Sequence, residues 1–335
     1  MAQRTEDEYI FADAYIGCHV SDLMNKSDMV RLANCSDLPS ADTLLQEFGY
    51  LECKETARKY IETFIRREQK NLYSLLFKNL VGREEMTSYL FPFDYHNIKV
   101  CLKSEFTGVT PDEDVLISTG HIDWKVMVAM IRDRNFSDMR PIMREAVEEA
   151  IDAFGRSGDP QQIDLVLDKA CYRDMADHAA DTGSEFIASM VDYMADVVNV
   201  KIFARLKMMG RPWTFFNDVC LRVGNIKPET FMAAYEEPFV QLADKILNER
   251  FSKAVREGGR ILDETGDFAM LEKLLDDAVM EENKRAKYYS FGIEPIVGYW
   301  FAKEVEIDNI RIILNGILGG VKPDTIIDML REPYV

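Results

Sequence analysis

The chain has 335 residues, of which 47% are hydrophobic and 29% charged, and its formal net charge is −18. This length predicts two or three domains, and the composition is typical of a globular protein with a substantial core. A surface of this charge repels phosphate backbones and anionic lipid headgroups, although it can also serve solubility alone. We therefore expect no nucleic-acid partner, and contact with a membrane only through other proteins.

The N-terminal residues are polar and acidic, which is not the pattern of a secretory signal. The best candidate for a membrane span, residues 312–321, is too short to cross a bilayer. The cysteines form no CxxC pair, so we expect free thiols in a reducing cytosol. They are Cys18, Cys35, Cys53, Cys101, Cys171 and Cys220.

Apolar residues recur three or four positions apart through most of the chain, which predicts amphipathic helices. The clearest segments, in chain order, are 57–80, 139–154 and 239–255. No segment shows strand alternation with hairpin turns. The sequence therefore predicts an all-α fold.

Helix boundaries are marked by glycine, aspartate and proline. Gly155 and Gly158 are expected to follow the second of these helices, and the pair Gly258 and Gly259 to lie in the third or just after it. Asp159-Pro160 predicts the start of another helix, with the aspartate as its N-cap.

One phrase of acid, two variable residues, Asn, Ile or Val, base, Ile or Val occurs three times, at spacings of 102 and 110 residues. Its polar members are Asp94, Asn97 and Lys99, then Asp196, Asn199 and Lys201, then Glu306, Asn309 and Arg311. Repetition at a nearly fixed period indicates repeated structural units. We expect three helical repeats at residues 1–110, 111–211 and 212–335, the first being the most diverged.

The second and third repeats match over further stretches at one constant offset. Residues 163–170 recur as 271–278, which places Asp168 and Asp276 at equivalent positions beside apolar residues. Partly buried capping or ion pairing is expected for these two carboxylates. Linkers are expected at 107–120 and 210–212, where Pro, Gly and polar residues cluster.

The asparagine of the phrase lies in an apolar helical context, where an unsatisfied buried amide costs about 1–3 kcal/mol. We expect it to bind the backbone of a neighbouring helix end within the same repeat, which is a structural role. The alternative is that the acid and the amide together bind a partner at each repeat.

Motifs of catalysis are missing from the sequence. It contains no P-loop ending in GK[ST], no HExxH and no GxSxG. His178 is the best lone candidate for a metal ligand, but with Asp174 and Asp177 beside it a solvated acidic helix face is the favoured interpretation. We expect no catalytic residue, no cofactor and no metal site.

The C-terminal third carries a more specific pattern. Phe301-x-Lys303-Glu304-x-Glu306-Ile-x-Asn309-Ile-Arg311 is followed by Gly316 and Gly319-Gly320, and preceded by Tyr288-Tyr289-x-Phe291-Gly292-x-Glu294-Pro295. This pattern, with the tail at 330–335, resembles the C subunit of archaeal and bacterial A/V-type ATPases, which is the equivalent of the d subunit of the vacuolar ATPase. The resemblance extends over essentially the whole chain and is weakest in the first repeat.

The resemblance implies a non-catalytic central-stalk protein. In that family, three similar helical domains surround a pseudo-threefold axis and form a funnel. One face lies on the membrane proteolipid ring, and the opposite opening receives the rotating shaft made of the D and F subunits. The implied location is peripheral, on the cytoplasmic face of the membrane. The implied role is to couple ATP hydrolysis or synthesis to transport of protons or sodium.

Two other classes remain open on the sequence. A stand-alone helical scaffold would bind a peptide in a groove and have no ATPase partners. An α-helical enzyme would hold Mg²⁺ between repeats with acidic residues, a pattern that Asp276-Asp277 with Glu281-Glu282 imitates only loosely.

Overall fold

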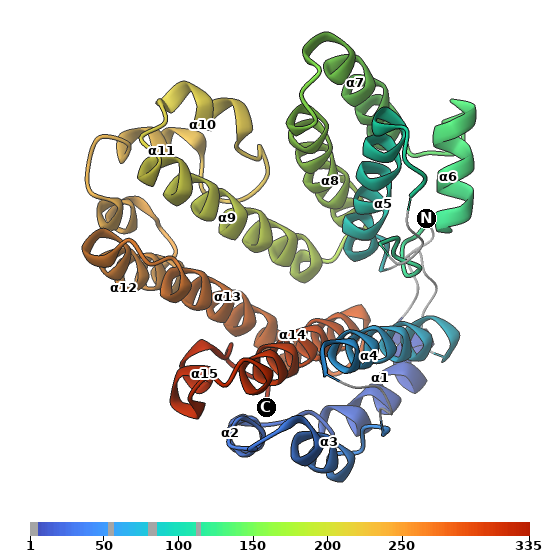
Figure 1. Ribbon diagram of the computed structural model, residues 1–335, viewed down its shortest axis with the longest axis vertical. Coiled ribbons are helices and arrows are strands. Elements are labelled where there is room, and N and C mark those ends of the chain that lie inside the picture. The colour runs from blue at the N-terminus through green and yellow to red at the C-terminus, as the bar shows by residue number, and fades with distance from the viewer. Residues whose placement is uncertain (1–5, 53–56, 80–85, 112–114) are drawn as a thin grey trace. The chain divides into compact units, whose positions relative to one another are not determined.

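The computed structural model describes residues 6–52, 57–79, 86–111 and 115–335 (Figure 1). Within these ranges all regular structure is α-helix or 3-10 helix, so the predicted all-α class is confirmed. Cys53 and residues 112–114 of the expected first linker lie outside the described residues. The chain divides into two compact units, a middle unit of residues 82–232 and a terminal unit of residues 2–81 and 233–335.

The middle unit is built on two long helices, α5 and α8, which pack against each other. Helix α7 covers α8 as an antiparallel neighbour, α6 packs on α5, and α9 follows α8 along the chain and contacts it. The helices of this unit are α5 (Thr87–Thr107), α6 (Trp124–Asp133), α7 (Pro141–Ser157), α8 (Gln161–Thr182), α9 (Glu185–Met208), α10 (Trp213–Val219) and α11 (Pro228–Ala233).

The terminal unit is organised around α14, the longest helix of the described residues, which contacts α1, α2, α3, α4, α13 and α15. Most of the α14 side chains that lie on these contacts are apolar and buried, so this helix forms the centre of the unit's core. The elements are α1 (Glu6–Val20), α2 (Lys26–Ala33), α3 (Leu38–Glu47), α4 (Ala57–Asn79), η1 (Phe239–Lys245), α12 (Glu249–Thr265), α13 (Ala269–Asn283), η2 (Lys284–Tyr288), α14 (Ile293–Leu318) and α15 (Pro323–Met329).

The expected helices at 57–80 and 139–154 are confirmed as α4 and α7. Gly158, in the left-handed conformation, caps α7, whereas Gly155 lies within that helix. Helix α8 begins at Gln161, and the Asp159 carboxylate accepts a hydrogen bond from the Gln161 amide at 2.9 Å. The expected start at Asp159-Pro160 is therefore correct to within a residue.

The single helix expected at 239–255 is wrong, because two elements occupy this stretch. The 3-10 helix η1 ends at Lys245, and Ile246 has an extended backbone. A new helix then starts where the Asn248 side chain accepts a hydrogen bond from the Phe251 amide at 3.0 Å. An asparagine N-cap of this kind favours a fresh helix start over continuation of the preceding one.

Gly258 and Gly259 lie buried in the middle of α12, which is the first of the two positions that the sequence left open, in a helix or just after it. A Cβ atom on Gly258 would lie 2.6 Å from the Leu271 Cα, and one on Gly259 would lie 2.7 Å from the Phe239 ring. The two glycines allow α13 and η1 to approach α12 closely. The helix ends instead at Gly266, whose φ is 75°.

Gly258→Ala is expected to destabilise the protein by about 1–3 kcal/mol, although alanine favours helix by about 1 kcal/mol. The reason is that the new methyl group would overlap the α13 backbone. Chemical denaturation provides the measurement. Gly155→Ala in α7 is the control, since no atom lies within 4 Å of its added Cβ, and this variant should be stabilised. Equal gains in both variants would contradict the close approach of α13 to α12.

The described cysteines are free thiols, as expected. Cys101, Cys171 and Cys220 are buried, and burial raises the pKa of Cys101 to about 11. Cys18 is exposed, so it is not a core thiol. In the described part of the chain, no helix is long and apolar enough to span a membrane.

Candidate functional site

The repeated phrase lies on three long helices, α5, α9 and α14. In each helix the acid and the asparagine are buried, and none of these six side chains is more than 4% exposed. The basic residue points to a more exposed side of the helix. Buried carboxylates and amides require partners, so the contacts of these groups define the site.

Each asparagine forms the same pair of hydrogen bonds with the backbone N–H and C=O of one residue. Its side-chain oxygen accepts from the backbone N–H, and its side-chain nitrogen donates to the carbonyl of the same residue. The respective distances are 2.8 and 2.9 Å for Asn97 with Ile117, 2.7 and 3.1 Å for Asn199 with Leu221, and 2.8 and 3.0 Å for Asn309 with Arg331.

The partner residue lies in the segment after each phrase-bearing helix, 20 residues on for Asn97 and 22 for Asn199 and Asn309. Leu221 and Arg331 directly follow the C-caps of the short helices α10 and α15, so these asparagines bind the backbone at a helix end. Ile117 lies in a loop instead. We call each asparagine, with the residue whose backbone N–H and C=O it binds, an amide anchor.

Two of the acids bind backbone N–H groups just beyond the amide anchor. Asp94 accepts from His121 at 3.1 Å and from Ile122 at 3.0 Å. Asp196 accepts from Asn225 at 3.1 Å and from Ile226 at 2.9 Å. These carboxylates hold the segments that lead into α6 and α11.

A glycine stands beside each of these carboxylates. A Cβ atom on Gly120 would lie 2.3 Å from Asp94 Oδ1, and one on Gly224 would lie 2.4 Å from Asp196 Oδ1. The φ of Gly224 is also 107°, outside the region open to other residues. Sequence reasoning did not identify these two glycines, although each follows its aspartate by 26 or 28 residues.

In α14 the acid binds the N-terminal part of the chain. Glu306 accepts from the Met24 amide, 282 residues earlier, and from the Tyr50 hydroxyl at 2.6 Å. Lys303 also pairs with this carboxylate. Met24 precedes Asn25, the N-cap of α2, as Ile122 precedes Asp123, the N-cap of α6. The segment before α2 therefore takes the place beside α14 that 120–122 takes beside α5.

The basic residues of the phrase on α5 and α14 form different contacts. On α5, Lys99 pairs with Asp168 of α8, one of the carboxylates expected to be ion-paired. On α14, Arg311 pairs with Asp308 of its own helix at 2.9 Å. Asp276 pairs instead with Arg331, whose backbone N–H and C=O Asn309 binds, at 3.1 Å. The ion pairing expected for Asp168 and Asp276 is confirmed, but Asp168 is exposed rather than partly buried.

Burial raises the pKa values of acidic groups in this framework. Burial raises the pKa of Asp196 to about 6, against the opposing effect of the hydrogen bonds from Ile226 and Asn225. The Tyr50 hydroxyl has its pKa raised well above its usual range by burial, and the Glu306 carboxylate adds to the effect. Because this buried tyrosine stays neutral, its hydroxyl can donate a hydrogen bond to Glu306 across the whole physiological pH range.

Another carboxyl group, that of the partly buried Glu304, lies between α14 and α4. Glu304 accepts a long hydrogen bond from Gln69 at 3.5 Å, and its Oε1 atom has no partner among the described residues. Trp300 donates to the Tyr73 hydroxyl at 3.2 Å in the same interface. Burial raises the pKa of Glu304 to about 7, and the nearby Asp308 carboxylate adds to this shift.

Stability is expected to fall as pH rises from about 5 to about 7, because folded Glu304 retains a proton that the unfolded chain releases near the ordinary glutamate pKa of 4.5. Glu304→Gln, which imitates the protonated form, should therefore be more stable than the natural chain at pH 8 by about 1–3 kcal/mol. At pH 4 the two should be nearly equal.

Urea unfolding at both pH values provides the measurement. Glu257→Gln, at an exposed position of α12, is the control and should not change the pH dependence. A Glu304→Gln chain with the natural pH dependence would show that this carboxyl titrates normally.

The interpretation of His178 as part of a solvated acidic face is wrong, because this side chain is only 3% exposed. Its Nδ1 atom lies 2.8 Å from the Ser88 hydroxyl. The neighbouring Asp174 is also buried and binds Arg140 at 2.8 Å and the Tyr95 hydroxyl at 3.1 Å. Arg140 neutralises the acidic groups whose number had suggested exposure to solvent.

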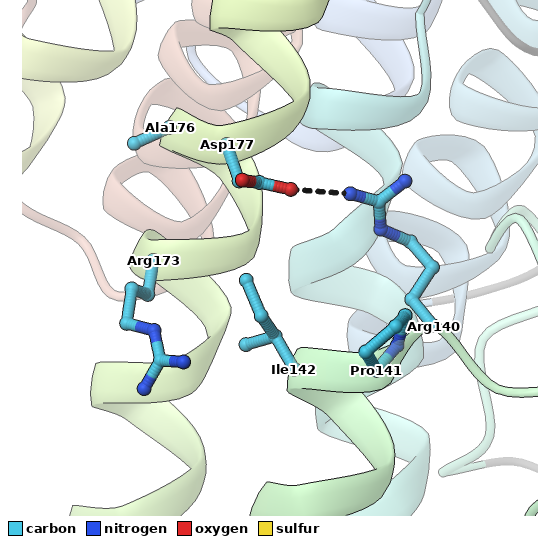
Figure 2. A pocket seen from close by; sticks show the side chains of 6 residues that line it. All are labelled: Arg140, Pro141, Ile142, Arg173, Ala176 and Asp177. Carbon is cyan, nitrogen blue, oxygen red and sulfur yellow. Dashed lines mark hydrogen bonds and ion pairs between the residues drawn. The ribbon is translucent and has the colours of Figure 1, made fainter.

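A depression beside this cluster is lined by Arg140, Pro141, Ile142, Arg173, Ala176 and Asp177 (Figure 2). Arg140 faces Asp177 across it at 2.9 Å while also binding Asp174, so two carboxylates share its charge. This arrangement joins the start of α7 to α8. In the described residues, no group of three His, Cys, Asp or Glu side chains could hold a metal ion.

The described residues thus define an all-helical protein whose buried acids and amides hold its own backbone. Residues 14–329 match the family described as the ATP synthase (C/AC39) subunit. This match extends over most of the chain, so the chain belongs to that family.

Curated relatives share low sequence identity over nearly their full length. The C subunit of the V-type sodium ATPase of Enterococcus hirae is 21% identical over 314 residues, which covers 93% of this chain and 95% of the relative. The C subunit of the A-type ATP synthase of Haloquadratum walsbyi is 23% identical over 335 residues, with 96% and 92% covered. That of Methanocaldococcus jannaschii is 21% identical over 360 residues, with 96% and 86% covered. The resemblance found in the sequence is confirmed.

Proposed function

We propose that this protein is the non-catalytic central-stalk subunit of a rotary A/V-type ATPase or ATP synthase. It acts as a socket that couples the rotating shaft, made of the D and F subunits, to the membrane proteolipid ring. Its place is peripheral, on the cytoplasmic face of the membrane, where it serves proton or sodium transport. Family membership over residues 14–329 supports this proposal, as do relatives that bear the names of A-type and V-type subunits.

The observation that carries the proposal is the amide anchor, which recurs on all three phrase-bearing helices. Each anchor ties a long helix to the segment 20 or 22 residues further along the chain. Such ties restrict bending of the helices, and densely packed interiors transmit strain well. A coupling protein needs a stiff body of this kind, whereas a catalytic one needs a reactive site.

The three-domain arrangement is part of the same proposal. Three helical repeats, 1–110, 111–211 and 212–335, would surround a pseudo-threefold axis as a funnel. The partners of Asn97 and Asn199, Ile117 and Leu221, lie beyond residues 110 and 211. Each of these anchors would then also tie one repeat to the beginning of the next.

The nine residues of the phrase are proposed to have structural roles. The acids and asparagines hold backbone, as described, and Lys99 and Arg311 form ion pairs. Lys201, the equivalent of Lys99, is partly exposed on α9. None of the nine is proposed to touch a cofactor or a substrate.

A pull-down from detergent-solubilised membranes tests the proposal. The affinity-tagged chain, expressed in place of the natural copy, should recover the proteolipid and the catalytic ATPase subunits in fixed ratio. Recovery of the chain as a free monomer would contradict the proposal and favour the stand-alone scaffold.

A further inference from the structure

Four large apolar side chains are exposed on two adjoining segments of the terminal unit. The exposed fractions are 87% for Tyr288, 37% for Tyr289, 49% for Phe291 and 47% for Ile10, which lies three residues before Asp13 and on the same side of α1. Isolated exposed apolar residues are common on protein surfaces, but aromatic clusters are typical of interaction sites. We call this set the aromatic patch.

The two segments are joined by Asp13 of α1. Its Oδ2 atom accepts a hydrogen bond from the Gly292 amide at 2.9 Å, which fixes α1 beside the residue that follows Phe291. Helix α1 also packs against α14, which begins directly after Gly292. The patch is therefore formed by both segments together.

Asp13, where the two segments meet, is a buried polar residue with one oxygen atom that is unpartnered in the described part of the chain. Its side chain is only 8% exposed, and its Oδ1 atom has no hydrogen-bond partner among the described residues. Burial raises the pKa of this carboxyl to about 6, and the Glu294 carboxylate adds to that effect. A buried acceptor without a donor is unfavourable, and a binding partner could supply the donor.

The basic residues closest in sequence to the patch already have partners in the terminal unit. Lys284 pairs with Glu281 at 2.7 Å, and Arg285 pairs with Glu282. Lys287 donates to the Tyr334 carbonyl at 2.6 Å and lies over the Tyr334 ring, 4.5 Å from its centroid. These cations are held in other contacts, so the charge of Asp13 is left for a group from outside.

We propose that the aromatic patch and Asp13 bind a segment of another protein of the ATPase complex that presents a lysine or arginine side chain between apolar residues. The apolar residues would lie on Tyr288, Phe291 and Ile10, and the basic group would donate to Asp13 Oδ1. Aromatic faces also attract cations directly.

Charge complementarity favours a basic protein segment over a lipid surface, a nucleic acid or a second copy of the chain. An anionic lipid surface or a nucleic acid would bring negative charge to a site that already holds Asp13 and Glu294. A second copy of the chain would bring a net charge of −18. The inference rests on the proposed place of the chain in the ATPase complex.

Rebinding to depleted membranes tests this inference. Membranes from cells that lack the chain, but contain the remaining ATPase subunits, are titrated with the full-length purified protein. The Tyr288→Ser/Phe291→Ser double variant and Asp13→Asn should each bind at least about tenfold more weakly than the natural chain, since central aromatic and charged residues dominate binding. Leu247→Ser, which removes a fully exposed leucine elsewhere in the terminal unit, should bind within about twofold of the natural chain.

The outcomes separate the two proposals. No binding of the natural chain would contradict the proposed function and this inference together. Normal binding by the double variant, with an unchanged circular dichroism spectrum, would overturn the inference alone. Since Tyr288 is 87% exposed, the double variant tests the patch even if Asp13→Asn does not fold. Equal binding to vesicles of the same lipids without ATPase subunits would also overturn it.

Discussion

Asn309→Leu is expected to lower the free energy of unfolding by about 2–4 kcal/mol. Leucine has nearly the shape of asparagine, so the change leaves no large cavity. It does remove both hydrogen bonds to Arg331 and leaves the backbone N–H and C=O of that residue without this partner. Asn97→Leu and Asn199→Leu should have losses of the same order, because their anchors have the same geometry. Urea or thermal unfolding measures the effect.

Asn315→Leu is the matched control for this prediction. Asn315 lies on the same helix, is exposed, and its side-chain nitrogen donates only within α14, to the Arg311 carbonyl at 2.8 Å. Its replacement should change stability by less than about 0.5 kcal/mol. Equal effects at positions 309 and 315 would contradict the amide anchor. Undiminished stability in all three anchor variants, with weaker binding to ATPase subunits, would favour the alternative that these groups bind a partner.

Gly224→Ala should be more damaging still, with an expected loss of about 3–5 kcal/mol. The added methyl group would lie 2.4 Å from Asp196 Oδ1, where the carboxylate binds the Asn225 and Ile226 amides. The φ of 107° adds backbone strain for any residue with a Cβ atom. Relief of the overlap requires Asp196 to release the backbone that it holds. Chemical denaturation is the measurement.

Gly210→Ala isolates the backbone contribution. Gly210 has a φ of 63°, and no atom lies within 4 Å of its added Cβ. Its replacement should cost only about 1 kcal/mol, the usual penalty for a left-handed position. A Gly224→Ala loss no greater than this value would show that the Asp196 contact can rearrange without penalty.

The helical class and the burial of the repeated asparagines could be predicted from the sequence because both depend on local pattern. Apolar spacing defines a helix face, and an amide on that face must find a partner. The pattern also placed Asp168 and Asp276 in ion pairs. The partners of the asparagines were predicted only in part. Asn199 and Asn309 bind backbone at a helix end, as expected, whereas Asn97 binds a loop residue. The partners of Asn97 and Asn199 also lie beyond residues 110 and 211, outside the repeats expected to contain them.

Contacts between distant parts of the chain could not be predicted in this way. No periodicity relates Glu306 to Met24, which lies 282 residues earlier, or to Tyr50. The buried state of His178 was missed because Arg140, 38 positions away in sequence, compensates the nearby acids. The sequence left open whether Gly258 and Gly259 lie in a helix or just after it, because a glycine that allows close approach of a neighbouring helix has the same local signature as one that ends a helix.

The central claim is that the protein couples the ATP-driven shaft to the ion-carrying ring. ATP-driven ion uptake into membrane vesicles, measured with and without the chain, tests it most directly. We predict that deletion abolishes uptake while the catalytic part still hydrolyses ATP, and that the added natural chain restores uptake. Uptake at the natural rate in vesicles that lack the chain would contradict the claim.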